Sequence, residues 1–320
     1  MKIVVLDKMN FLADFPKMSF DCNWQEFQTS RPDQVLERLS GAQIAVTHKT
    51  VLNESHFSKL PDLKLITTNS TGYNTIDEKA AARYGIVVCN VQDWCTNAVV
   101  EHVLGFIFSL KRNILPYHLD IRSGLWNDSG TGSYALLHPP KGEIAGSTLG
   151  IIGYGNLGRL LKQKATGLGM KVLISDRKGV QSTRKGYVAF TEVITKSDII
   201  VLLAPLNDDT YKMIAAQELV QMKPSTILIN CGRGGLVDET DLANALIDNI
   251  IPGAGIDVFE QEPPRQDNPL MTYTGNNLLI SSHVAFSSLE SIACNTNQIV
   301  NNIEQYHLGS PSRVVNRHML

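Results

Sequence analysis

Three residues in the second half of the chain have side chains suited to one reaction. Arg233, Glu262 and His283 each lie at or shortly after the end of a short apolar segment that is expected to form a strand. A planar guanidinium can hold a carboxylate and polarise the neighbouring carbonyl group. A histidine can give that carbonyl oxygen its proton as a hydride arrives, and a glutamate on the far imidazole nitrogen orients the ring and favours its cationic form. Together they predict reduction of a 2-keto acid, although each residue taken singly also has an ordinary structural explanation.

A glycine pattern upstream predicts the source of the hydride. Residues 149–158 read Leu-Gly-Ile-Ile-Gly-Tyr-Gly-Asn-Leu-Gly, a buried strand that runs into G-x-G-x-x-G. Gly153 permits the tight turn, Gly155 lets the backbone approach a pyrophosphate, and Gly158 lets helix and strand pack closely. The helix that follows offers unpaired N–H groups and the positive end of its dipole to phosphates. This order of elements predicts a dinucleotide site.

The next predicted strand ends on Asp176, which is expected to select the dinucleotide. A carboxylate at this point can accept hydrogen bonds from both hydroxyls of the adenosine ribose, and it would repel a 2′-phosphate. NAD is therefore favoured over NADP. Arg177 and Lys178 follow directly and offset part of that repulsion, so the preference is not absolute.

Short β-branched runs alternate with helical patterns almost from end to end, which predicts βαβ units and an α/β fold. Several runs are apolar throughout, as expected for parallel strands that are covered on both faces. The predicted strands are 2–7, 43–47, 64–69, 86–90, 148–153, 171–176, 198–203, 226–230, 253–257 and 277–281. An apolar helix is expected at 97–117, a strandless glycine- and proline-rich stretch at 119–144, and a last helix at 289–308.

The composition argues against several other classes of protein. A chain of 320 residues fits about two domains of ~100–200 residues each. A net charge of −2 leaves no electrostatic footprint for nucleic acid or an anionic membrane. The first apolar run is too short for a signal peptide, and no run approaches the ~18 apolar residues of a membrane span. The five cysteines form no CxxC motif, which argues against a metal site and predicts mostly core thiols in a reducing cytoplasm.

Taken in order, these and further motifs resemble the D-isomer-specific 2-hydroxyacid dehydrogenases along essentially the whole chain. The matching pieces are 70–77, Thr96 with Glu101 and His102, 149–158, 204–206 with Thr210, 230–238, 257–263, and 268–270 with His283. The resemblance implies that Arg233 binds the substrate carboxylate and carbonyl, that His283 is the general acid/base, and that Glu262 is its partner. It also implies that Thr71 and Gly72 present backbone N–H groups to the carboxylate. The implied cofactor contacts are Thr96, Gly153, Gly155, Asn156, Leu157, Gly158, Asp176, Pro205, Thr210, Cys231, Gly232 and Asp257.

The family's architecture gives an expectation for the fold and assembly. A Rossmann cofactor domain, residues 98–286, would be inserted in a flavodoxin-like substrate domain made of 1–97 and 287–320, each a doubly wound parallel sheet. Members are typically homodimers built on the cofactor domains, with the helix at 97–117 and the stretch after it at the interface. One departure is Ser282, where the family usually has a proline before the histidine; serine loosens the local backbone restraint.

Within the family the chain is most similar to the glycerate dehydrogenase/hydroxypyruvate reductase branch, on the segments 48–50, 126–129 and 232–234. Lys49 follows a strand and is expected to reach the distal hydroxyl or carboxylate of the substrate, a solvated lysine being the alternative. Glycolate/glyoxylate is the other substrate pair expected. A D-lactate-type reductase and an NAD-sensing, co-repressor-like binding protein remain as alternatives.

Overall fold

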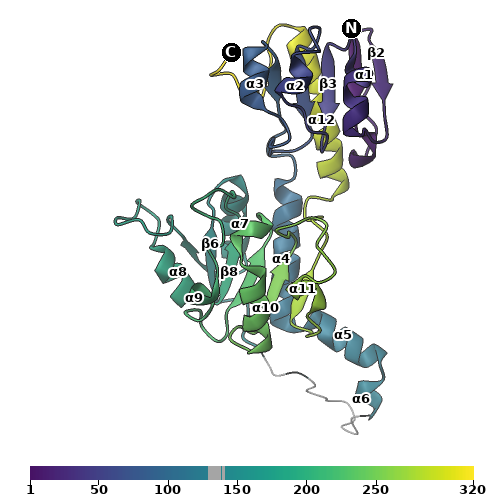
Figure 1. Ribbon diagram of the computed structural model, residues 1–320. Helices are drawn as coiled ribbons and strands as arrows, with labels where there is room; N and C mark the ends of the chain where they lie inside the picture. The colour runs from purple at the N-terminus through teal and green to yellow at the C-terminus, as the bar shows by residue number, and fades with distance from the viewer. Residues whose placement is uncertain (129–137, 139–140) are drawn as a thin grey trace. The chain divides into compact units, whose positions relative to one another are not determined.

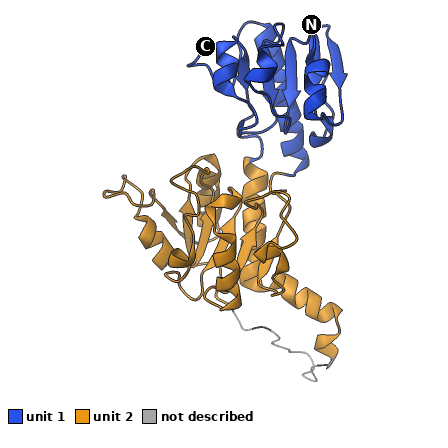
Figure 2. Cartoon of the chain, viewed as in Figure 1, with its two compact units in different colours: residues 1–95, 287–320 blue, residues 96–286 orange. Residues whose placement is uncertain are grey.

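The computed structural model describes residues 1–128, 138 and 141–320, which form two compact units (Figures 1 and 2). Unit 1 comprises Met1–Cys95 and Ser287–Leu320, and unit 2 comprises Thr96–Phe286. Unit 2 is thus an insertion in the chain of unit 1. None of the described helices is long and apolar enough to cross a membrane.

Unit 1 is built on a sheet of five parallel strands in the order β2-β1-β3-β4-β5, which is the flavodoxin-like order. Its strands are β1 (Lys2–Val5), β2 (Asn23–Glu26), β3 (Ile44–Thr47), β4 (Leu65–Thr68) and β5 (Val87–Cys89). Its helices are α1 (Val35–Leu39), α2 (Glu54–Phe57), α3 (Glu78–Arg83) and α12 (Leu289–His307), with 3-10 turns at Lys8–Asn10 and Pro32–Gln34. Alternate strand residues pack on two apolar clusters, one with α1–α3 and the other with α12. This two-sided burial explains why the central strands β1, β3 and β4 are largely apolar.

Unit 2 is built on six parallel strands in the order β11-β10-β9-β8-β6-β7. The strands are β6 (Thr148–Ile152), β7 (Lys171–Ile174), β8 (Ile199–Leu202), β9 (Ile227–Asn230), β10 (Ala254–Ile256) and β11 (Leu278–Ile280). After α4–α6, described below, the helices are α7 (Asn156–Gly167), α8 (Phe190–Lys196), α9 (Ala216–Leu219), α10 (Glu239–Ile247) and α11 (Pro269–Thr272), with a 3-10 turn at Gly234–Leu236. In the sheet, β7 lies on one side of β6 and β8 lies on the other, so the direction in which strands are added reverses after β7. Ligands of open α/β sheets bind at such a reversal, beyond the carboxyl ends of the strands.

The predicted α/β architecture with two parallel sheets is confirmed, and each of the ten predicted strands overlaps an observed one. The prediction missed β2. This strand pairs only with β1, so it lies at the edge of its sheet, and its sequence Asn-Trp-Gln-Glu has no apolar run to announce it.

The helix expected at 97–117 is present to Arg112 but is not single: two helices cover this range, and a third short helix follows them. They are α4 (Thr96–Arg112), α5 (Ile114–Arg122) and α6 (Leu125–Asp128). Asn113 separates α4 from α5 and adopts a left-handed backbone with φ of 51°, which ends the helical path. Ser129 of the 126–129 motif, and most of the stretch expected at 119–144 beyond α6, lie outside the described residues.

Candidate active site

The three residues singled out for chemistry follow three neighbouring strands of unit 2. Arg233 comes after β9, Glu262 after β10 and His283 after β11, and these strands are adjacent in the sheet. Because the strands are parallel, their carboxyl ends meet at one edge, and the loops that carry the three side chains leave from that edge. The sheet therefore brings together loops that are up to fifty residues apart in the sequence.

Glu262 and His283 form a direct pair. Nδ1 of His283 lies 2.6 Å from Oε2 of Glu262, and Oε1 of Glu262 accepts a 3.1 Å hydrogen bond from the backbone N–H of Phe259. The carboxylate is thus held by its own loop and orients the imidazole ring through one nitrogen. Both side chains are partly exposed, His283 at 43% and Glu262 at 35%.

The backbone of His283 is held by Asp257, at the end of β10. His283 has a φ of 56°, an uncommon left-handed conformation for a residue other than glycine, and its N–H donates a 2.7 Å bond to the Asp257 carbonyl. The buried carboxylate of Asp257 accepts from the N–H of Val284 at 2.9 Å, from the N–H of Ala285 at 3.0 Å, and from the Ser281 hydroxyl. These bonds restrain the loop at the place where the family's proline is missing.

Asn230 and Gly234 position the loop of Arg233. The side chain of Asn230 is buried at the end of β9; it donates to the carbonyl of Arg233 at 2.9 Å and accepts from the N–H of Gly232 at 3.1 Å. A Cβ atom on Gly234 would lie 1.8 Å from the backbone carbon of Phe259, so this loop touches the loop of Glu262 main chain to main chain. Sequence reasoning missed both positioning residues. The signals were a polar residue closing an apolar strand and glycines on both sides of Arg233.

The guanidinium of Arg233 is exposed and makes one described hydrogen bond, from Nη1 to the carbonyl of Gly232 at 2.8 Å. An arginine has five N–H donors in a fixed fork. The remaining donors suit a carboxylate and the adjacent carbonyl oxygen.

The glycine loop after β6 has the shape expected of a pyrophosphate cradle. Gly153 has a φ of 102°, and a Cβ there would lie 2.4 Å from the backbone nitrogen of Ala204, after β8. A Cβ on Gly158 would lie 2.4 Å from the carbonyl oxygen of Gly153, whereas nothing lies within 4 Å of one on Gly155. Helix α7 begins at Asn156, beside this open space. The residues therefore fit a dinucleotide, with room at Gly155 and backbone N–H groups of Asn156, Leu157 and Gly158 at the helix start.

The other predicted cofactor contacts lie around this loop or at the start of unit 2. Pro205 and Thr210 belong to the loop after β8, where the Thr210 hydroxyl donates to the Pro205 carbonyl at 2.7 Å. Cys231 and Gly232 follow β9 and are buried, and burial raises the pKa of the Cys231 thiol. Thr96 is the first residue of α4.

Asp176 lies at the end of the β7 segment, and its side chain is almost fully buried. Its carboxylate is paired with Arg184, which donates from its side chain and its backbone, and with the N–H of Arg177; these bonds lower the pKa of Asp176 to about 2. Lys178, which the sequence suggested as a partial counter-charge, instead pairs with Glu218 at 2.8 Å. Arg184 supplies that counter-charge.

In unit 1, the predicted substrate residues follow β3 and β4. Lys49 is exposed, and its loop is anchored by the buried carboxylate of Asp7, which accepts from the N–H of His48, Lys49 and Thr50 at 2.7–3.1 Å. Thr71 and Gly72 lie after β4, where the Thr71 carbonyl accepts a 2.9 Å bond from Asn90.

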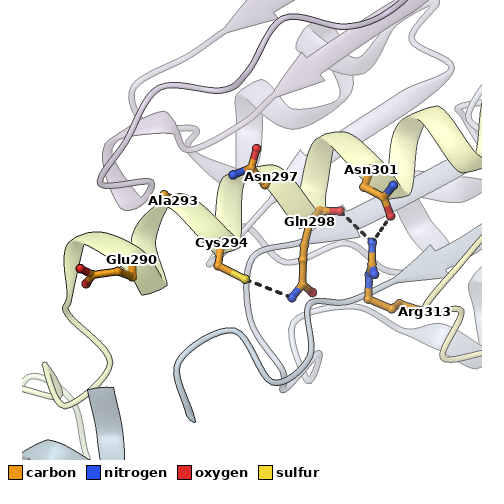
Figure 3. Close-up of a pocket in the computed structure, with 7 residues that line it drawn as sticks. All are labelled: Glu290, Ala293, Cys294, Asn297, Gln298, Asn301 and Arg313. Atoms are coloured by element: carbon orange, nitrogen blue, oxygen red, sulfur yellow. Dashed lines mark hydrogen bonds between the residues drawn. The ribbon is translucent and has the colours of Figure 1, made fainter. Parts of the chain in front are cut away.

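A hollow of about 470 Å³ lies along α12 in unit 1 (Figure 3). It is lined by Glu290, Ala293, Cys294, Asn297, Gln298, Asn301 and Arg313. Arg313 is tied to Asn301 and to the carbonyl of Gln298, and no residue predicted for chemistry lines the hollow. Across the described ranges, no three His, Cys, Asp or Glu side chains are grouped as metal ligands would be.

A parallel sheet with a glycine cradle, and a histidine–glutamate pair beyond its strands, define an NAD-linked oxidoreductase. The family model described as "D-isomer specific 2-hydroxyacid dehydrogenase, NAD binding domain" matches residues 104–285. The chain belongs to the D-isomer specific 2-hydroxyacid dehydrogenase family. It is an enzyme of 2-hydroxyacid oxidoreduction, with NAD as its cofactor.

Relatives of this chain match it over its whole length. A glycerate dehydrogenase of Methylorubrum extorquens is 42% identical over 98% of this chain and 98% of its own. A D-isomer specific 2-hydroxyacid dehydrogenase from Lactobacillus delbrueckii ssp. bulgaricus, solved with NAD, is 25% identical, with a TM-score of 0.78 over 98% of this chain and 100% of its own. An acyclic imino acid reductase solved with NADPH and D-Arg is 30% identical, with a TM-score of 0.81 over 98% of this chain and 100% of its own.

Proposed function

We propose that this enzyme interconverts a small D-2-hydroxy acid and its 2-keto acid, with glycerate/hydroxypyruvate or glycolate/glyoxylate as the substrate pair. The observation that carries the catalytic assignment is the 2.6 Å pair of His283 and Glu262 beside the loop of Arg233. The whole-length similarity to a glycerate dehydrogenase supports the substrate class.

The proposed chemistry divides between the cofactor and three side chains. The bound nicotinamide supplies or accepts the hydride. Arg233 binds the substrate carboxylate and polarises the carbonyl oxygen. In reduction, His283 donates the proton on Nε2 to that oxygen; in oxidation, it removes the hydroxyl proton. Glu262 keeps Nδ1 as the donor to its carboxylate and stabilises the cationic ring.

Further contacts are proposed from both units. Thr96, Pro205, Thr210, Cys231, Gly232 and Asp257 would complete the cofactor site around the glycine loop, with Asp176 on the adenosine ribose. Thr71 and Gly72 would donate backbone N–H groups to the substrate carboxylate. Lys49 would bind a polar group on C3 of the substrate, which hydroxypyruvate has and glyoxylate lacks.

The Lys49 assignment has a direct test. In Lys49→Met, the ratio of kcat/KM for hydroxypyruvate to that for glyoxylate should fall, because only the first substrate offers a distal hydroxyl. Lys59→Met, another exposed lysine of unit 1, is the matched control. An unchanged ratio in Lys49→Met would leave Lys49 as a solvated lysine.

We also propose a homodimer formed through unit 2. Support comes from α5 and α6, which extend from the body of unit 2 (Figure 1) and expose large apolar side chains: Ile114, Leu115, Leu119, Ile121, Leu125 and Trp126. Exposed apolar groups in such number typically mark an interaction surface. Leu119→Glu together with Ile121→Glu should shift the mass measured by light scattering from dimer to monomer. A cytoplasmic location is proposed from the five free thiols.

The substrate is decided by NADH oxidation with a panel of keto acids. The panel contains hydroxypyruvate, glyoxylate, pyruvate, 2-ketoisocaproate, phenylpyruvate and oxaloacetate, each with and without an added amine. The highest kcat/KM with hydroxypyruvate or glyoxylate is the expected result. A preference for pyruvate would favour a D-lactate-type reductase, and turnover only with amine would favour an imino acid reductase. Tight NADH binding without turnover would favour a co-repressor-like binding protein.

A further inference from the structure

We propose that Arg184 enables the adenosine-ribose end of the cofactor site to accept a 2′-phosphate, so that this enzyme binds NADP(H) as well as NAD(H). The inference rests on the assignment of Asp176 to the ribose. It does not depend on which 2-keto acid is reduced. In dinucleotide-binding sheets, an acid after the second strand contacts the ribose 2′-hydroxyl, or an arginine nearby accommodates a 2′-phosphate. This chain has both residues, in contact with each other.

Protein donors engage both oxygens of the Asp176 carboxylate. Oδ1 accepts hydrogen bonds from Nε of Arg184 at 2.9 Å and from the N–H of Arg177 at 2.8 Å, and it lies 2.8 Å from Nη2 of Arg184 as an ion pair. Oδ2 accepts from the backbone N–H of Arg184 at 2.7 Å. A carboxylate offers about four acceptor positions. A ribose therefore meets a carboxylate whose charge is balanced and which keeps about one acceptor position, on Oδ2, for a ribose hydroxyl.

Arg184 is held in place while part of its guanidinium faces outward. The guanidinium carbon lies 4.0 Å from the ring centre of Tyr187, and the side chain is 54% exposed. Only the Nε and Nη2 atoms contact Asp176, so three of the five N–H groups point elsewhere. An arginine in this state can bind a second anion without giving up the first.

The charge balance at this position favours an added anion. A phosphate monoester carries about −1.5 to −2 at neutral pH, and an unpaired carboxylate beside it would repel it. Arg184 cancels the charge of Asp176, and the exposed side chain of Arg177 adds a second positive group nearby. Lys178 makes no such contribution, because it is paired with Glu218.

A purely structural role for Arg184 predicts something different. Arg184 joins the loop between β7 and α8 to the end of β7, so its loss would also loosen that loop. A loosened loop would weaken NAD+ and NADP+ binding alike. If Arg184 instead binds the 2′-phosphate, its loss would weaken NADP+ binding more than NAD+ binding and so change the ratio of the two dissociation constants.

The test is calorimetric titration of NAD+ and of NADP+ into the full chain, with no substrate present. In the wild type, the two dissociation constants should differ by less than roughly tenfold, and Arg184→Gln should weaken NADP+ binding by roughly tenfold or more while changing NAD+ binding less than about threefold. Lys185→Gln removes the same charge from the neighbouring exposed residue and should leave the ratio unchanged. Arg184→Lys should retain part of the NADP+ affinity.

Two results would overturn the proposal. One is equal weakening of both dinucleotides in Arg184→Gln, which is the structural outcome. The other is wild-type binding of NADP+ more than about a hundredfold weaker than that of NAD+, a difference of ~2.7 kcal/mol. Asp176→Asn separates this failure from failure of the ribose assignment. The substitution should strengthen NADP+ relative to NAD+ if Asp176 contacts the ribose, and should leave the ratio of the two dissociation constants unchanged if it does not.

Discussion

Nδ1 of His283 and Oε2 of Glu262 lie 2.6 Å apart, in loops that follow the neighbouring strands β11 and β10. The other carboxylate oxygen accepts the N–H of Phe259, so the glutamate cannot turn away without losing a second bond. The pair therefore presents one imidazole nitrogen to the carboxylate and leaves the opposite nitrogen for proton exchange.

The charge of Glu262 should set the pH range of reduction. In Glu262→Gln the hydrogen bond can persist, but the negative charge that stabilises the cationic ring is gone. Reduction requires protonated His283, so the pH at which kcat/KM for reduction falls should move to lower values. Oxidation requires the neutral ring, so the pH at which kcat/KM for oxidation rises should also move to lower values. The measurement is kcat/KM from about pH 5 to 10 in both forms.

An unmoved profile would contradict this role, provided that a deuteride isotope effect shows the chemical step to be rate-limiting. A profile moved to higher pH would mean that the carboxyl group is itself protonated at neutral pH. The two residues would then have to be treated as one coupled titrating unit.

Arg233 should contribute to the transition state rather than to cofactor binding. Arg233→Ala removes both the carboxylate anchor and the polarising charge, and kcat/KM should fall by roughly a hundredfold or more. The dissociation constant of NADH, measured by titration without substrate, should be nearly unchanged. A variant that kept most of its kcat/KM would rule out the anchoring role.

Gly234 should be intolerant of any side chain. A Cβ atom would lie 1.8 Å from the backbone carbon of Phe259, so Gly234→Ala must separate the loops of Arg233 and Glu262. We expect a loss of about 1–3 kcal/mol in the free energy of unfolding, together with a lower kcat. Gly105→Ala is the matched control: it lies within α4 with nothing inside 4 Å of its Cβ, and should stabilise by about 0.5–1 kcal/mol. Equal behaviour of the two variants in chemical denaturation would contradict the argument.

The buried thiols should resist modification in the native chain. Burial raises the pKa of Cys89 to about 12 and also raises that of Cys231, so little reactive thiolate exists near neutral pH. Cys294 is partly exposed and lines the hollow along α12. Alkylation at about pH 8 followed by peptide mass spectrometry should label the partly exposed Cys22, Cys95 and Cys294 in the native chain, and Cys89 and Cys231 only after denaturation. Native labelling of Cys89 at the rate of Cys294 would show that its site opens to solvent.

The sequence alone determined those features that depend on local pattern. Ten strands were predictable because each carries an apolar run, as parallel strands that are covered on both faces require. The edge strand β2, Asn-Trp-Gln-Glu, has no buried residue and carries no such run, so it was not predictable. The glycine cradle was also predictable from local pattern. The tight turn at Gly153, the approach of the backbone to a pyrophosphate at Gly155 and the close packing of helix on strand at Gly158 each require glycine at a fixed spacing. The candidate catalytic residues could be named because each follows a strand end and belongs to a motif that resembles the family's.

Only the tertiary structure decided which groups hydrogen-bond to the candidate site residues and which groups balance their charge. Asp257 restrains the backbone of His283 from the neighbouring strand, and Gly234 meets Phe259 across more than twenty residues of sequence. The counter-charge of Asp176 proved to be Arg184, farther along the loop than the Lys178 that the sequence suggested. Such pairings depend on where loops of unpredictable path return to the sheet. No periodicity encodes that path, because loop residues have no repeating face to bury.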